Sequence, residues 1–472
     1  MGSKEKRLAH NTLLIALSNM CTKFISFFMM PLYTSLLSTQ EYGVADVVAM
    51  YTSLLAMGIN LQLEQGVFRY LIESRGNVHK QTEYINSALW VTVGALCVFG
   101  LLAVPVLHWL NYKYAEYLIA SVIISVLMSL LLQIPRGCGD NRGYALISCV
   151  TGSTGVILNV LLIAVAGWGV DGILHAGMIA NVVGILLVIL RTKLWKRVSI
   201  CWFRKKAVKE LLNYSLPMVP GTFMWWIINA SDRLFINVVL GTSFNGIYAV
   251  ANKFASTYTM GVNVFQTAWT ESAAENIHDA DRNRFYQGIF NTTLRIASSC
   301  YLGIVAIMPV VFKILVNENF GEAYLYVPIL LIAAMLYAVS SFYGSVFLAF
   351  KKTTVVAGTT VFAAIINLVI NLLFIQQMGL YATSISTALA YATIVLIRHR
   401  GIKKLTDISV DNRFVIRMSL AIAVALLGYY SDSIVLHRIL PFFMIPYCYV
   451  ENRQTIGALI KGICKKLGIC NE

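Results

Sequence analysis

Runs of roughly 20 apolar residues recur along the whole chain, separated by short polar segments. A helix of that length is about 30 Å long, which matches the hydrocarbon core of a bilayer. Of the 472 residues 58% are hydrophobic and only 12% are charged, whereas soluble domains average about 25% charged residues. The chain is therefore expected to be an all-α, polytopic membrane protein.

The apolar runs divide the chain into fourteen candidate transmembrane helices. Their limits are set by the polar breaks between runs, where lipid exposure would be costly. The expected spans are 12–37, 43–63, 84–109, 115–134, 144–166, 170–190, 213–240, 246–270, 286–316, 324–349, 354–375, 379–397, 414–430 and 433–450.

Basic residues are concentrated in alternate connections between these spans. If the amino terminus is cytoplasmic, most of the 37 Lys and Arg residues lie in cytoplasmic segments, while the external connections contain Lys113 and, near a span edge, Arg438. This is the positive-inside distribution, and it predicts a multi-pass membrane protein with both termini in the cytoplasm. The net charge of +15 thus indicates an anionic cytoplasmic leaflet as partner and excludes nucleic acid.

The chain is expected to consist of two homologous lobes and smaller additions. The expected segments are an N-terminal six-helix lobe (1–190), a basic interfacial linker (191–212), a C-terminal six-helix lobe (213–397), two additional helices (398–450) and an amphipathic cytoplasmic tail (451–472).

A repeat supports the two lobes. "STQEYGVADVVAMYTSLLAMGIN" (38–60) aligns without gaps with "GTSFNGIYAVANKFASTYTMGVN" (241–263), matching Gly43 with Gly246 and Gly58 with Gly261. The two segments run in the same direction through the membrane, so a pseudo-twofold axis along the membrane normal is predicted. A weaker match relates Gly169 to Gly379.

No catalytic motif is present. The sequence lacks HExxH, GxSxG and Walker A motifs, and its nine cysteines show no metal-ligand spacing. We expect neither an enzyme nor a bound metal or cofactor.

Polar side chains within the spans are the candidate functional residues, because intramembrane polarity is costly unless it faces protein or water. Span 246–270 is the most polar, and the stripe of span 43–63 that contains Asp46, Ser53 and Asn60 is expected to face the same aqueous centre. The candidates for substrate binding are the bases Lys23, Arg233, Lys253 and Arg295 and the amides Asn60, Asn252, Asn263 and Gln266; the candidates for ion coupling are Asp46 and Asp232.

The four bases exceed the two acids, which favours an anionic substrate such as a phosphate. The alternative interpretation is that the charges pair and only fix helix packing, Asp46 with Lys23 and Asp232 with Arg233 or Lys253.

Four segments resemble the Wzx-type polysaccharide or O-antigen flippases of the multidrug/oligosaccharidyl-lipid/polysaccharide superfamily. They are "SLLSTQEYGVADVV" (35–48), "IPRGCGDNRGYALIS" (134–148), "SDRLFINVVLGTSFNGIYAVANKF" (231–254) and residues 350–392. The resemblance implies a MATE-like fold of two six-helix bundles around a cationic cavity. It also implies a cargo of undecaprenyl-pyrophosphate-linked oligosaccharide that moves from the cytoplasmic to the periplasmic leaflet of the bacterial inner membrane. We expect the two halves to move this cargo by alternating access.

Lys23 and Lys253 match the positions of the family's cavity-lining bases. A polysaccharide polymerase and a chain-length regulator are the partners that the resemblance implies. Related lipid II flippases carry a base in the second span, where this chain has Asp46 and Met50, which weighs against that substrate. A cation-coupled exporter of small molecules stays open as an alternative because of Asp46.

Overall fold

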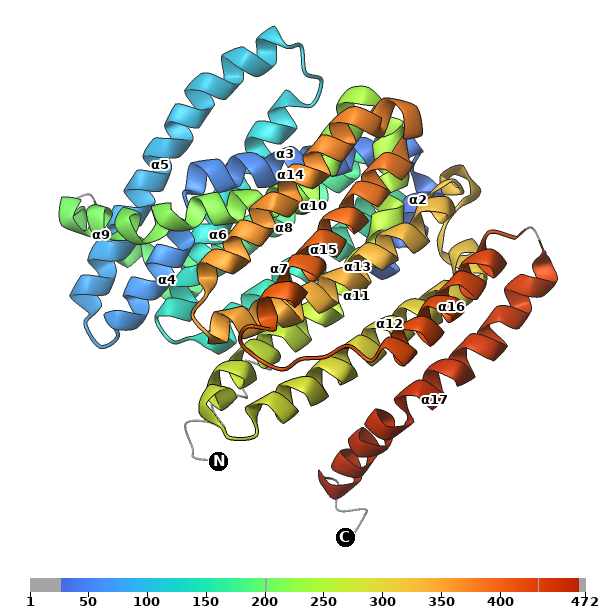
Figure 1. Ribbon diagram of the computed structural model, residues 1–472. Helices are drawn as coiled ribbons and strands as arrows, with labels where there is room; N and C mark the ends of the chain where they lie inside the picture. Colours follow the sequence, from blue (N-terminus) through green and yellow to red (C-terminus); the bar gives the residue numbers. More distant parts are fainter. Residues whose placement is uncertain (1–26, 200–201, 432, 467–472) are drawn as a thin grey trace. The chain divides into compact units, whose positions relative to one another are not determined.

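The computed structural model describes residues 27–199, 202–431 and 433–466, and these residues are helical with short connections and no β-strand. The chain divides into two compact units, Met1–Gly246 and Ile247–Glu472. Figure 1 shows the helices of each unit packed side by side. The all-α prediction is confirmed for the part of the chain described.

The first unit consists of long helices joined by tight turns. They are α2 (Met30–Leu36), α3 (Thr39–Asn60), α4 (Leu63–Glu73), α5 (Val78–Trp109), α6 (Ala115–Gly137), α7 (Asn141–Asn159) with the π-helical η1 (Val160–Val165), α8 (Gly169–Thr192), η2 (Leu194–Lys196), α9 (Lys205–Ser215), η4 (Leu216–Met218) and α10 (Val219–Val239).

Local chemistry sets where these helices begin and end. Ser38 and Glu41 form a capping box that starts α3, and Asp140 caps α7 by accepting from the Gly143 amide. The predicted span 43–63 ends early because Leu61 and Gln62 both have left-handed backbone conformations, φ 49° and 58°. For residues other than glycine this conformation is costly, so tertiary packing must hold the break between α3 and α4.

The core of the first unit lies where α4, α6, α8 and α9 meet. Leu71, Ile134, Val188 and Leu211 are almost completely buried there. Leu211 belongs to α9, whose lysines lie on its exposed side. The predicted interfacial linker 191–212 thus contains a genuinely amphipathic helix.

The second unit follows α11 (Thr242–Glu275), which begins in the first unit and ends in the second. Its elements are η5 (Asn276–His278), α12 (Arg282–Leu315), η6 (Glu318–Phe320), α13 (Ala323–Ala349), α14 (Thr353–Met378), α15 (Leu380–Ile402), α16 (Asn412–Tyr429) and α17 (Ile434–Lys466). α13 is the central helix, since 67% of its most apolar window is buried. Near the end of α11, Trp269 stacks on Phe342 of α13, with 4.8 Å between the ring centroids.

Eleven helices of the described residues are long and apolar enough to cross a membrane. They correspond to eleven of the fourteen predicted spans. Large apolar side chains remain exposed along them, as expected for a lipid-facing surface. The first predicted span, 12–37, lies mostly outside the described residues.

α10 and α11 coincide with the remaining two predicted spans, 213–240 and 246–270, but are not among those eleven. They carry Asp232, Arg233, Asn252 and Lys253, which explains their lower hydropathy. The helices that contain most of the predicted site are therefore the least lipid-like.

The predicted tail does not begin a new element at residue 451. α17 runs without interruption from Ile434 to Lys466, and its membrane-spanning part extends to Arg453. The division of the chain into lobes, linker and tail stays a prediction.

Candidate functional site

An ion pair joins the two helices α3 and α10. Arg233 Nε lies 3.1 Å from Asp46 Oδ2, with side chains 23% and 18% exposed. The buried Asn245 at the start of α11 donates to the same carboxylate oxygen at 3.0 Å. Because the Asp46 carboxylate supplies the countercharge, the charge of Arg233 is largely neutralised within the first unit.

This pairing differs from the pairings considered on the sequence, which joined Asp46 to Lys23 and Asp232 to Arg233 or Lys253. Arg233 and Asp232 diverge by about 100° around α10, and Arg233 turns toward Asp46 of α3. Asp232 is only 3% exposed. Lys23 lies outside the described residues.

The rest of the α3 stripe also packs on α10. Met50 is 1% exposed against Trp226 and Ala230, and Trp226 Nε1 donates to Ser53 Oγ at 3.0 Å. The expectation that this stripe faces water was wrong for Met50, which α10 covers, whereas Ser53 is exposed.

The two repeated segments cross at their helix starts. Thr39 Oγ1 and Ser243 Oγ are 2.6 Å apart, and the backbones approach so closely that a Cβ on Gly43 would lie 1.9 Å from the Thr242 carbonyl oxygen. A Cβ on Gly246 would lie 2.0 Å from the Thr39 carbonyl oxygen. The residue pairs matched by the sequence repeat thus make reciprocal contacts, as a twofold relation requires.

α11 carries the predicted polar face into the second unit. Asn252 and Lys253 are half-buried, and the side chain of Asn263 further along is exposed. Lys253 is half-buried on a helix that carries several polar side chains, so it stays the candidate base of α11 for an intramembrane binding role.

Two predicted amides meet a tyrosine that sequence reasoning missed. Tyr337 of α13 donates to Asn263 Oδ1 at 2.6 Å and approaches Gln266 Oε1 at 3.3 Å. Tyr391 of α15 stands edge-on to Tyr337 at 5.4 Å between ring centroids. We call Asn263, Gln266, Tyr337 and Tyr391 the amide–tyrosine cluster. Amides and aromatic rings together suit a polyhydroxylated ligand, since they offer hydrogen bonds and flat apolar faces.

Asn60 has a structural environment. It is 4% exposed, and its Nδ2 donates to Glu64 and, at 3.0 Å, to Ser129 Oγ of α6. These contacts fix the α3–α4 break and leave little of Asn60 accessible to a ligand.

Arg295 of α12 is directed toward α16 and α17. Its Nη1 donates to the Glu451 carbonyl oxygen at 3.2 Å, and its guanidinium lies 5.4 Å from the centroid of the Phe414 ring. The Glu451 carboxylate is itself paired with Arg417 at 3.1 Å. Arg295 is therefore engaged with α16 and α17.

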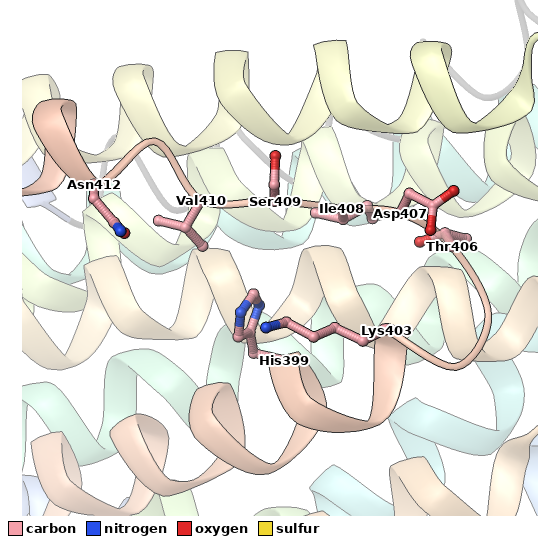
Figure 2. A pocket seen from close by; sticks show the side chains of 8 residues that line it. All are labelled: His399, Lys403, Thr406, Asp407, Ile408, Ser409, Val410 and Asn412. Carbon is pink, nitrogen blue, oxygen red and sulfur yellow. The ribbon is translucent and has the colours of Figure 1, made fainter.

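A pocket of about 450 Å³ lies elsewhere in the second unit, at the turn after α15. Figure 2 shows Lys403 beside His399 below the loop 406–410. His399 Nδ1 is 2.9 Å from the Tyr343 hydroxyl. The backbone amide of Ser409 donates a hydrogen bond to Oε1 of Gln287, on α12, at 2.7 Å. None of the predicted site residues lines this pocket, and no group of three His, Cys, Asp or Glu in the described ranges could hold a metal.

Comparison with known structures places the fold. An inward-facing MATE family transporter of the MOP superfamily superposes with a TM-score of 0.67 at 15% identity, over 84% of this chain and 98% of that one. The lipid II flippase MurJ, in an inward closed conformation, gives a TM-score of 0.66 at 13% identity, over 94% of this chain and all of that one. The protein is a multi-pass helical membrane protein with the MATE-like fold of that superfamily.

Sequence comparison then gives the family. Residues 8–270 match the polysaccharide biosynthesis protein family, and the chain belongs to it. It is also 26% identical over 267 residues to the succinoglycan biosynthesis transport protein ExoT of Rhizobium meliloti (strain 1021). That match covers 53% of this chain, and the chain spans about half the length of that relative. The resemblance predicted from the sequence is confirmed at the level of the polysaccharide biosynthesis protein family and of the MATE-like fold.

Proposed function

We propose that the protein is a flippase that moves an undecaprenyl-pyrophosphate-linked oligosaccharide, an O-antigen or capsular repeat unit, from the cytoplasmic to the periplasmic leaflet of the bacterial inner membrane. The proposal places both termini in the cytoplasm. It is supported by membership of the polysaccharide biosynthesis protein family and by the similarity to ExoT, whose name assigns it to succinoglycan transport.

The observation that carries the proposal is the polar face of α11. It carries Lys253 and, further along the helix, the two amides of the amide–tyrosine cluster. A pyrophosphate taken out of water needs a charge-assisted donor, and sugars need hydrogen bonds and ring faces. One helix thus offers chemistry for both parts of a lipid-linked oligosaccharide.

Among the four predicted bases, we assign the pyrophosphate to Lys253 together with Lys23. Arg233 is neutralised by Asp46 and Arg295 is directed to Glu451, so neither contributes the full charge expected from the sequence. Asp46 and Arg233 instead form an ion pair between α3 and α10.

The electrical potential can supply the driving force. An anion that leaves a negative cytoplasm gains about 2.3 kcal/mol per charge per 100 mV. Transport of a pyrophosphate in this direction therefore needs no ATP hydrolysis, and the sequence contains no Walker A motif.

A cation-coupled exporter of small molecules is less well supported, because such a carrier needs an acid available to the cation. The Asp46 carboxylate is already paired with Arg233 and accepts a hydrogen bond from Asn245.

Lys253→Ala tests the proposal in cells deleted for the native protein and in proteoliposomes loaded with a fluorescent undecaprenyl-pyrophosphate glycan. We expect loss of surface polysaccharide and of glycan translocation, with normal insertion. Lys313→Ala, which removes an exposed base of α12, is the matched control and should retain both. Full translocation by the Lys253 variant would refute the assignment, and dye efflux that depends on Asp46 would favour the exporter.

A further inference from the structure

A basic pocket of about 400 Å³ lies in the first unit, where α8 ends. Its lining residues come from the α6–α7 turn and from the segment after α8: Pro135, Cys138, Asp140, Arg191, Thr192, Lys193, Lys196 and Arg197. None of the residues that line this pocket is assigned to the oligosaccharide above.

One acid stands against four bases in this pocket. Asp140 binds Arg191 bidentately, with Nε–Oδ2 2.5 Å and Nη2–Oδ1 3.1 Å, and so neutralises it. Lys193, Lys196 and Arg197 make no ion pair with any residue that the structure describes. The pocket therefore keeps a cationic rim.

The segment that carries these bases is rigidly held. Lys193 ends α8 in a left-handed conformation, φ 51°, and the next residue, Leu194, is 5% exposed in the core of the unit. Asn86 of α5, fully buried, donates to the Arg197 carbonyl at 2.8 Å and accepts from the Ser199 amide at 2.8 Å. A clamped turn of this kind presents its cations without the entropy cost of ordering a loose loop.

An apolar strip leads along α8 to the same turn. Ile179, Val182, Leu186 and Leu190 are between 39% and 60% exposed, and they recur at the spacing of one helix face. Lys193 continues that spacing, and Trp195 beside it is 53% exposed. Tryptophan at the end of a lipid-facing helix is typical of the membrane interface.

We propose that this pocket binds the phosphate headgroup of an anionic membrane lipid whose acyl chains lie on the exposed face of α8. The strip accounts for the acyl chains, and Lys193, Lys196 and Arg197 account for the phosphate. Free phosphate would need the bases but not the apolar strip or Trp195, so the combined features favour the lipid.

Trp195 provides the measurement. The purified full chain is placed in phosphatidylcholine nanodiscs that contain a minor fraction of brominated phosphatidylglycerol, or of brominated phosphatidylcholine as reference. Because bromine quenches tryptophan at short range, the difference between wild type and Trp195→Phe isolates the signal of this site. We expect phosphatidylglycerol to quench it more strongly.

The variants Lys193→Gln and Lys196→Gln should each lower that preference about fivefold, since a base near an anionic surface contributes about 1 kcal/mol. The matched control is Lys403→Gln with Lys404→Gln, two exposed bases at the turn after α15, which should leave the preference unchanged. Lys196→Glu, which adds repulsion at the surface without touching the core, should lower the preference further than Lys196→Gln.

Three outcomes would overturn the proposal. They are equal quenching by both lipids in the wild type, an unchanged preference in the Lys193 and Lys196 variants, and removal of the preference by millimolar inorganic phosphate at constant ionic strength. The last would assign the pocket to free phosphate. Because quenching is measured without transport, each outcome is independent of the flippase activity.

Discussion

Arg398 is a buried guanidinium that donates its hydrogen bonds to uncharged groups of the described residues. It is 5% exposed on α15 and donates to the Ser340 carbonyl at 2.8 Å, to Thr359 Oγ1 at 3.0 Å and to the Val356 carbonyl at 3.2 Å. The planar guanidinium of Arg398 thereby connects α15 to α13 and α14 through hydrogen bonds. The predicted span ended at residue 397, so the sequence placed Arg398 in a loop rather than in this contact.

Replacing Arg398 should destabilise the second unit. Arg398→Met leaves several buried acceptors without donors, at a cost of about 3 kcal/mol. Thermal unfolding in detergent should show a lowered midpoint, and Arg398→Lys should restore only part of it because an ammonium cannot span all three helices. Arg400→Met, which changes an exposed neighbour, is the control, and an equal effect of both Met variants would contradict this role.

The ionisation of Asp140 should make the free energy of unfolding depend on pH. The Arg191 guanidinium lowers the pKa of the Asp140 carboxyl most, the Gly143 amide adds to this, and partial burial opposes it. Because the folded pKa lies below the unfolded value of about 3.9, the interaction stabilises the fold above that pH. The stabilisation is lost as the pH falls through the folded pKa.

Asp140→Asn should therefore lower stability at neutral pH by about 0.5 kcal/mol, since the carboxyl is partly exposed, and should weaken the decline below about pH 4. Asparagine can still cap α7, so the change reports the charge rather than the cap. Unfolding midpoints across this pH range provide the measurement, with Asp279→Asn at an exposed acid as reference. A variant with the same pH profile as the wild type would rule out the interaction.

At the scale of elements, the crossing of α3 and α11 depends on the absence of side chains at Gly43 and Gly246. Gly43→Val would force the Thr242 carbonyl away and separate the helix starts. Cysteines at positions 39 and 243, whose hydroxyls are now 2.6 Å apart, should form a disulfide readily in the parent and poorly beside Gly43→Val.

Gly58→Val is the matched control for this crossing. Gly58 lies on the same helix and belongs to the same sequence repeat, but a Cβ there meets nothing within 4 Å. Its cross-linking yield should match that of the parent. Equal yields for the Gly43 and Gly58 variants would show that the crossing tolerates a side chain.

The sequence was most informative about the positions of the helices and least informative about which side chains contact one another. Apolar runs predicted eleven spans that the structure confirms, and the repeat matched Gly43 with Gly246 because both need a close backbone approach. The break at Leu61 and Gln62 was missed, since neither residue type favours a left-handed backbone.

The candidate site shows the same limit. Polarity identified Asp46 and Arg233 as candidates. Their pairing with each other depends on how α10 packs on α3, and this packing cannot be predicted from a single sequence. Tyr337 had no polar signal in its apolar helix, so only its distance to Asn263 reveals it.

At the scale of the whole molecule, the charge distribution predicts which connections face which side. The bases in alternate connections place Lys113 outside and the α11–α12 turn around Asp281 inside, and both positions are exposed. Single cysteines at these positions, in a variant whose nine native cysteines are replaced by alanine, should react differently with a membrane-impermeant maleimide.

In intact spheroplasts the cysteine at position 113 should be labelled and the one at 281 protected, and both should be labelled after permeabilisation. Moving one span out of the membrane would reverse every later connection, so position 281 tests the count of spans before it. Labelling of both positions in intact cells would contradict the proposed topology. It would also remove the electrical argument for export, because the pyrophosphate gains energy from the potential only if it leaves the side where the bases are.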